Sequence, residues 1–132
     1  MRNLGFKAMH IEHDDRYYCS GGPRPKYYEV GKTYIYRGKP ILCEQGFHFC
    51  KNIDDVASYY SLTILNAIFL VESLGECNEG RDKSVTNKIK IIRRITDTEF
   101  NLLSKKFYVL NGMYFGKRKA KAVLMGRLQN AK

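Results

Sequence analysis

The sequence has no tryptophan, only three prolines and four cysteines among its 132 residues, and it has no long apolar run. The most apolar segment, LTILNAIFLV at 62–71, is about half the length that a membrane-spanning helix needs. The start, MRNLGFKAMH, has no apolar run behind its basic residue, so it does not resemble a secretory signal. We therefore expect a cytoplasmic protein with no membrane partner and with reduced thiols at Cys19, Cys43, Cys50 and Cys77.

Acidic residues are nearly absent from the end of the chain. Residues 83–132 hold thirteen Lys and Arg against two Asp and Glu, a net charge of +11, whereas residues 1–82 hold ten against eleven, a net charge of −1. Such one-sided charge points to a polyanionic partner: nucleic acid, a nucleoprotein or nuclease complex, or an acidic protein surface. The alternative is a charged surface that only keeps the protein soluble.

The length suits one domain with a core of its own. Strands are predicted at 5–12, 27–36, 41–50, 66–76 and 88–95, with loops at 13–26 and 78–87. In KIKIIRRI, Ile89 and Ile91 fall on one face, and Lys88, Lys90 and Arg94 fall on the other. Asn52 can cap a short helix at about 53–61, and the capping box TDTE at 96–99 predicts a second helix that ends near Lys105 or Lys106.

Beyond residue 106 the sequence predicts a basic extension. Asn111-Gly112 between apolar and aromatic residues is a hairpin signal, and apolar residues recur at helical spacing from Ala120 to Leu128. We therefore expect an α+β fold, mostly antiparallel, with two or three short helices: a core domain at 1–106 and a basic hairpin and helix at 107–132. The pattern lacks the regular βαβ alternation of a doubly wound sheet.

The segment CEQGFHFC at 43–50 gathers residues that often carry chemistry. Zinc is disfavoured, because Cys43 and Cys50 are too far apart for a ligand pair, and a Cys50–His48 catalytic pair is disfavoured because i and i+2 side chains on a strand stand well apart. The favoured interpretation is structural: Phe47, Phe49 and the cysteines pack in a core, and His48 points away toward a loop. No metal, cofactor or catalytic residue is assigned.

The basic region contains aromatic residues, and such a mixture can meet phosphates and stack on bases. The candidate binding residues are Lys88, Lys90, Arg94, Lys105, Lys106, Tyr108, Tyr114, Lys117, Arg118, Lys119, Lys121 and Arg127.

Five segments, YYEVGKTYIY, CEQGFHFC, DDVASYY, VESLGE and DKSVTNKIKIIRRI, occur in this order. Over roughly residues 5–95 the chain resembles a family of small phage and prophage proteins, with Tyr-Glu-x-Gly-x-x-Tyr, Cys-x-x-Gly-Phe-His-x-Cys and Gly-Asp-Lys-Ser segments. Arg81 interrupts the last of these. The resemblance implies a phage-type scaffold that carries an added basic arm, plausibly an inhibitor of a host defence nuclease, including an RNA-guided (CRISPR) one.

A weaker similarity concerns GFHFCKNIDDVASYY, which resembles the aromatic strand and following helix of ADP-ribosyltransferases. That resemblance implies a NAD-dependent enzyme as the alternative, with a cleft near His10, His48 and Tyr60. It is a likeness of fold alone, because Glu72 and Glu76 come too early for the family's glutamate.

Overall fold

The computed structural model describes residues 2–12, 16–19, 27–56, 59, 66–104, 108–110 and 113–115, the last two ranges by their backbone alone. The chain divides into two compact units, Met1–Arg94 and Ile95–Lys132. The division that we expected after residue 106 therefore falls inside the second unit.

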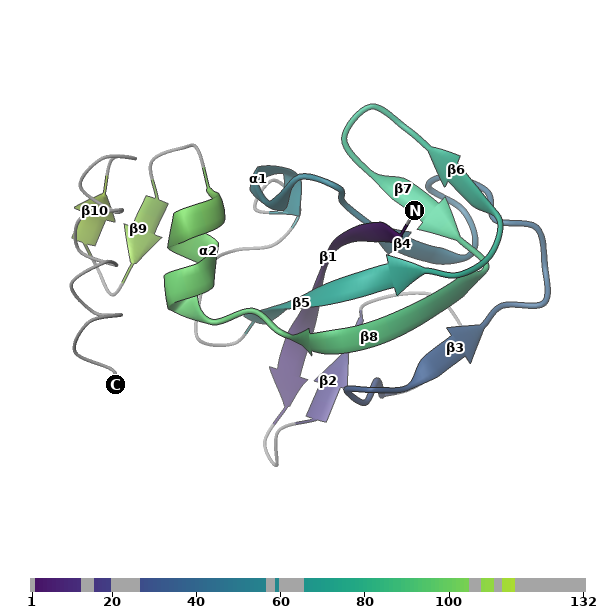
Figure 1. The fold of residues 1–132 in the computed structure, drawn as a ribbon, viewed down its shortest axis with the longest axis horizontal. Helices are drawn as coiled ribbons and strands as arrows, with labels where there is room; N and C mark the ends of the chain where they lie inside the picture. Colours follow the sequence, from purple (N-terminus) through teal and green to yellow (C-terminus); the bar gives the residue numbers. More distant parts are fainter. Residues whose placement is uncertain are drawn as a thin grey trace. The chain divides into compact units, whose positions relative to one another are not determined.

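Strands dominate the first unit (Figure 1). Its elements are β1 (Asn3–Glu12), β2 (Arg16–Tyr18), β3 (Thr33–Ile35), β4 (Phe47–Phe49), α1 (Ile53–Val56), β5 (Asn66–Ser73), β6 (Cys77–Glu79), β7 (Ser84–Thr86) and β8 (Lys88–Arg94). They form a five-stranded sheet in the order β2-β1-β5-β8-β3 and a three-stranded sheet in the order β4-β7-β6. Every described pairing is antiparallel, so this is a small sheet-dominated domain.

One long hairpin belongs to both sheets. Its first limb is β5 followed by β6, and its second limb is β7 followed by β8 (Figure 1). At the bend the fully buried Thr86 hydroxyl accepts a hydrogen bond from Ser73 Oγ at 2.7 Å and donates one to the Glu76 carbonyl at 2.9 Å. Gly75 fits here because a Cβ would lie 2.1 Å from Asn87 Oδ1, which accepts the Glu76 N–H at 2.9 Å.

The larger of two core clusters lies on one face of the five-stranded sheet. It is formed by Met9, Tyr28, Phe47, Phe49, Ala67, Phe69, Val71, Ile89 and Ile91. The alternation predicted for β8 is confirmed at Ile89 and Ile91, which are 0% and 1% exposed. Arg94 does not continue this alternation, because a β-bulge leaves Ile92 without a cross-strand partner. Arg94 is therefore opposite Phe69 and does not share a face with Lys88 and Lys90.

Several sequence predictions need correction. The loop predicted at 78–87 contains β6 and β7, and the loop predicted at 13–26 contains β2. The strand predicted at 27–36 is reduced to β3, with Tyr28 in an isolated bridge to Tyr17. These short strands were missed because each spans only three residues, too few for a clear alternation of apolar and polar side chains.

The second unit contains α2 (Asp97–Leu103), β9 (Tyr108–Leu110) and β10 (Met113–Phe115). The capping box is confirmed: the Thr96 side chain accepts from the Glu99 N–H at 3.1 Å, and Glu99 Oε1 accepts from the Thr96 N–H at 3.2 Å. The antiparallel pairing of β9 with β10 confirms the predicted hairpin. The helix predicted from Ala120 to Leu128 lies outside the described residues.

Candidate functional site

The structure describes only part of the predicted basic surface. Seven of its residues lie outside the described part of the chain: Lys105, Lys106, Lys117, Arg118, Lys119, Lys121 and Arg127. Tyr108 and Tyr114 occupy β9 and β10, where Tyr108 pairs with Phe115 and Tyr114 with Val109. The remaining three residues, Lys88, Lys90 and Arg94, are on β8.

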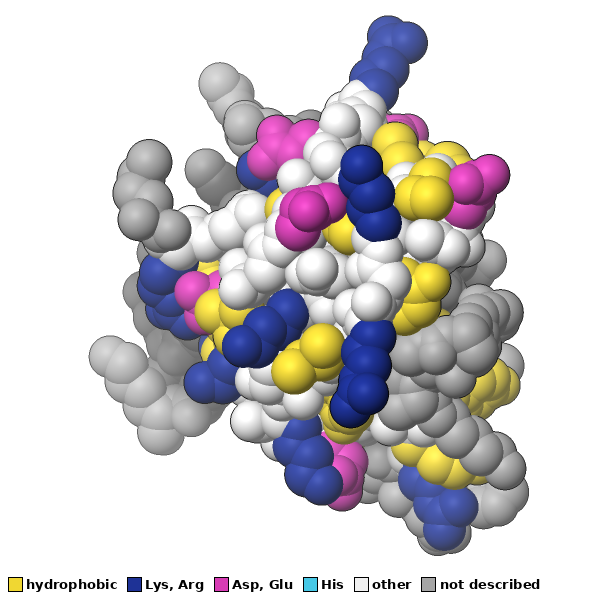
Figure 2. All heavy atoms as spheres, turned by 90° about the vertical axis from the view of Figure 1, so that its right-hand side faces the viewer, with side chains coloured by type: hydrophobic (Ala, Val, Ile, Leu, Met, Phe, Trp, Pro, Cys, Tyr) yellow, Lys and Arg dark blue, Asp and Glu magenta, His cyan; other side chains and the backbone are white. Residues whose placement is uncertain are grey.

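On β8, Lys88 and Lys90 lie on the face opposite the core, and both are half-buried. Lys90 pairs with Glu72, whose carboxylate also accepts two hydrogen bonds from the Arg2 guanidinium, each of 3.1 Å. The Arg2 hydrogen bond and the charges of Arg2 and Lys90 hold the pKa of Glu72 below its usual value. Figure 2 shows positive and negative side chains interspersed on the face that it views.

The segment CEQGFHFC is a tight turn followed by β4. Cys43 has a φ of 65° and Gly46 a φ of 109°, so the turn uses left-handed backbone at both positions. Phe47 and Phe49 are each 2% exposed, as the structural interpretation predicts. His48 accepts the Cys43 N–H at Nε2 over 2.8 Å. Cys43 itself is exposed, which corrects its assignment to the core.

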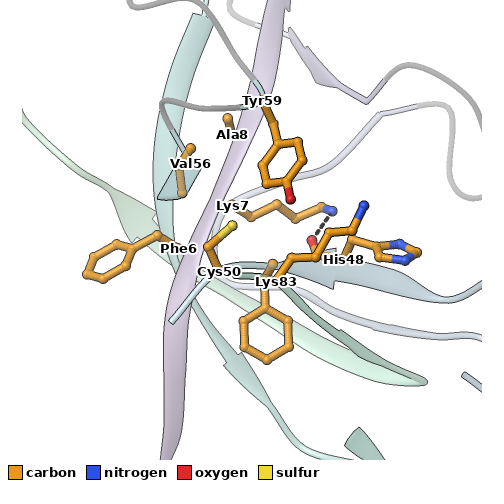
Figure 3. Close-up of a pocket in the computed structure, with 9 residues that line it drawn as sticks. Phe6, Lys7, Ala8, His48, Cys50, Val56, Tyr59 and Lys83 are labelled. Carbon is orange, nitrogen blue, oxygen red and sulfur yellow. Dashed lines mark hydrogen bonds between the residues drawn. The ribbon is translucent and has the colours of Figure 1, made fainter. Parts of the chain in front are cut away.

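A cavity of about 160 Å³ opens beside β4. β1, β4, the residues around α1 and the turn before β7 contribute its walls (Figure 3). The lining residues are Phe6, Lys7, Ala8, His48, Phe49, Cys50, Val56, Tyr59 and Lys83. None of these described residues carries a carboxylate.

Two lysines supply the positive charge of this pocket. Lys7 shares the inward parity of Gly5 and Met9 on β1, so its side chain is only 9% exposed. Its ammonium donates to the His48 carbonyl at 2.5 Å. The Lys83 ammonium lies 4.9 Å from the centre of the Tyr59 ring, within the range of a cation–π contact.

His48 and Cys50 are held in their neutral forms. Burial, with the charges of Lys7 and Lys83, lowers the pKa of His48 to about 4. Burial, with the negative charges of Asp55 and Asp82, raises the pKa of Cys50 to about 11. Because nucleophilic catalysis by cysteine needs the thiolate, the Cys50 thiol is not an activated nucleophile, although it shares the pocket with His48.

Of the residues near which the ADP-ribosyltransferase resemblance implies a cleft, the structure describes His10 and His48, and only His48 lines the pocket. His10 bonds Asn66 Oδ1 through Nδ1 at 2.8 Å and lies against Tyr18, and it does not line the pocket. Tyr60 lies outside the described residues. Lys7 and Lys83 were not among the candidate site residues predicted from the sequence. The available signal was a lysine at an inward position of the otherwise apolar run GFKAM.

No cluster of three or more His, Cys, Asp or Glu that could hold a metal ion occurs within the described ranges. Within the same part of the chain, no helix has both the length and the apolar character needed to cross a membrane.

The fold and pocket define a small antiparallel sheet domain with a lysine-lined cavity. Residues 4–103 match the family model described as Domain of unknown function (DUF7666), so the chain belongs to this family. The match includes every lining residue of the pocket and stops before β9. No curated protein and no solved structure matches the chain.

Proposed function

We propose that this chain is a small basic binding protein that engages nucleic acid, or a complex that handles nucleic acid, through its carboxy-terminal residues. The observation that carries the proposal is the separation of charge: +11 in residues 83–132 against −1 in residues 1–82. Positive potential concentrated in one part of a chain attracts a polyanion and accelerates its association.

The extent of the family match separates the core of the chain from its basic carboxy-terminal arm. The family match ends at residue 103, whereas eight of the chain's Lys and Arg lie between residues 105 and 132. The proposal therefore assigns binding to an arm, a basic hairpin and helix on an α+β core, that the family model does not include. Lys88 and Lys90 on β8 are further candidate binding residues in the first unit.

In its specific form, the proposal is that a phage or other mobile element supplies this protein to the host cytoplasm, where it inhibits a defence nuclease in the manner of an anti-CRISPR protein. The polyanion could be the nucleic acid that such a complex holds, or an acidic patch of the nuclease. The resemblance of the motif order to that of phage and prophage proteins motivates this form.

The alternative, a NAD-dependent ADP-ribosyltransferase-like enzyme, has less support. The described pocket, about 160 Å³, is smaller than the roughly 300 Å³ at which pockets for drug-sized ligands begin. A thermal-shift measurement with NAD tests this alternative directly.

The decisive experiment measures nucleic-acid binding by fluorescence anisotropy at several salt concentrations, with single-stranded DNA, duplex DNA and RNA as separate probes. The test variant replaces Lys117, Arg118, Lys119 and Lys121 by Gln. The matched control replaces Lys32, Arg37, Lys39 and Lys51 by Gln, which removes the same charge from exposed positions of the first unit.

We expect the test variant to lose about 10²–10³-fold in affinity at physiological salt, because four phosphate contacts are removed. The control should lose far less. Equal losses in the two variants, or no binding to any probe or to a nuclease complex in a parallel pull-down, would overturn the proposal.

A further inference from the structure

We propose that the pocket between β1, β4, α1 and the turn before β7 binds a small organic carboxylate, with the anionic group held by Lys7 and Lys83 and the apolar part on the inner wall. This site is separate from the proposed polyanion surface and does not depend on it.

Lys7 is a nearly buried lysine at the edge of the pocket. A lysine is rarely buried unless its ammonium is paired. Lys7 belongs to none of the ion pairs found in the described residues, and its ammonium donates to one carbonyl, that of His48. An ammonium has three donors, so two remain for a ligand. An anion in the pocket would compensate the buried charge.

Polar side chains converge on one side of the pocket. Figure 3 shows the polar ends of Lys7, Lys83 and Tyr59 on the same side of the pocket. The Tyr59 ring lies under the Lys83 ammonium and supports it. Asp82 raises the pKa of the Tyr59 hydroxyl to about 12, and the charge of Asp55 contributes to the raised pKa of Cys50, but neither carboxylate lines the cavity.

The remaining wall of the pocket is largely apolar. Phe6, Ala8, Phe49, Cys50 and Val56 offer no strong hydrogen-bond donor from their side chains. A phosphate would leave most of its oxygens unsatisfied against such a wall, whereas a carboxylate has two oxygens and an apolar remainder. The volume, about 160 Å³, is close to that of cavities that hold a benzene ring. These features together select a carboxylate on a ring or short chain.

The test uses the full chain and three probes at constant ionic strength: benzoate, benzyl alcohol, which is a neutral ring compound of similar size, and inorganic phosphate. Binding is followed by the backbone amide shifts of Ala8, Phe49 and Cys50 in two-dimensional NMR spectra. We expect benzoate to bind with a dissociation constant on the order of 1 mM, and each of the other probes at least about 10-fold more weakly.

The variants separate a charge effect from a folding effect. Lys7→Met keeps an apolar stem of similar length, and Lys83→Met alters a more exposed position in the same pocket. Lys39→Met, an exposed lysine outside the pocket, is the matched control. We expect Lys7→Met to weaken benzoate binding at least about 10-fold and Lys83→Met about 3-fold to 10-fold, and Lys39→Met to leave it unchanged.

Equal binding of benzoate and benzyl alcohol would overturn the proposal, since the lysines would then play no part. Tighter binding of phosphate than of benzoate would also overturn it, as would no shift with any probe. If Lys7→Met fails to fold, Lys83→Met and the probe series still decide the matter.

Discussion

The cations of the pocket and the cations of β8 differ in how the fold holds them. Lys7 is nearly buried, has a fixed hydrogen bond to a backbone carbonyl, and faces a cavity without a carboxylate. Lys90 is half-buried on an outer sheet face and pairs across the strands with Glu72, which Arg2 also contacts. A fixed, desolvated charge can select a ligand by shape, whereas exposed charges act mainly through their sum.

The largest expected difference is between the salt dependence of nucleic-acid affinity and that of benzoate affinity. Nucleic-acid affinity should fall about 10²–10⁴-fold between low and physiological salt, because neutralised phosphates release counterions. Benzoate affinity should fall only about 3-fold over the same range, because a buried pair is screened less. Anisotropy and NMR titrations in the same buffers measure both. An equal dependence of both affinities on salt concentration would show that the pocket lysines behave as surface charges.

Acid should weaken the fold through His48. The unfolded chain takes up a proton at His48 near pH 6.5, whereas the folded chain does so only near pH 4. Acidification between these values therefore stabilises the unfolded state, and stability is fully present only above about pH 6.5. We expect a loss of about 2 kcal/mol, less than the full shift implies because water partly screens the half-buried ring.

Urea denaturation of the wild type and of His48→Gln across this pH range measures that loss. Since carboxylates titrate in both proteins, the difference between the two curves isolates His48. Identical pH dependence in the two proteins would contradict a neutral, partly desolvated imidazole beside two lysines.

Exchanging the lysines tests the comparison at an intermediate size. Replacing Lys88 and Lys90 together by Gln should lower nucleic-acid affinity about 10-fold at physiological salt, if each meets one phosphate. Lys7→Met should leave the same affinity within about 2-fold, because a buried ammonium does not reach a phosphate backbone. The comparison fails if Lys7→Met weakens nucleic-acid binding as much as the double variant does.

The smallest effect is expected from Tyr59→Phe. The substitution removes the hydroxyl whose pKa Asp82 raises but keeps the ring beneath the Lys83 ammonium. Benzoate affinity should change by no more than about 3-fold, since the cation–π contact is retained. Tyr59→Ala, which removes the ring as well, provides the contrast in the same NMR titration. A larger loss for Tyr59→Phe than for Tyr59→Ala would contradict the supporting role of the ring.

Much of the fold was predictable where local patterns are strong. The strands around Met9, Phe69 and Ile89 alternate or run apolar, and the Thr96–Glu99 capping box is set by four consecutive residues. The bulge at Ile92 was not predictable, because it depends on the pairing of β8 with β5. The strands β6 and β7 were not predictable, because each has three residues and β7 also pairs with the distant β4.

The candidate site shows the same limit. The packing of Phe47 and Phe49 follows from alternation in GFHF, and the hydrogen bond to His48 was expected to come from a loop. The pocket was not predictable, because Lys7 and Lys83 lie far apart in sequence and meet His48 only through tertiary folding. A single inward lysine in a strand does not reveal which segment will face it.

The bent hairpin has a consequence for how the first unit opens. Ser73, Thr86 and Glu76 are hydrogen-bonded to one another at the bend of the hairpin. Neither of the two sheets can therefore separate at this bend without breaking these hydrogen bonds. The amide hydrogens of β7 and β8 should therefore exchange with deuterated solvent as one cooperative group, at a rate set by global unfolding. Lys83, at the tip, and Lys90, in the stem, thus belong to a single folding unit.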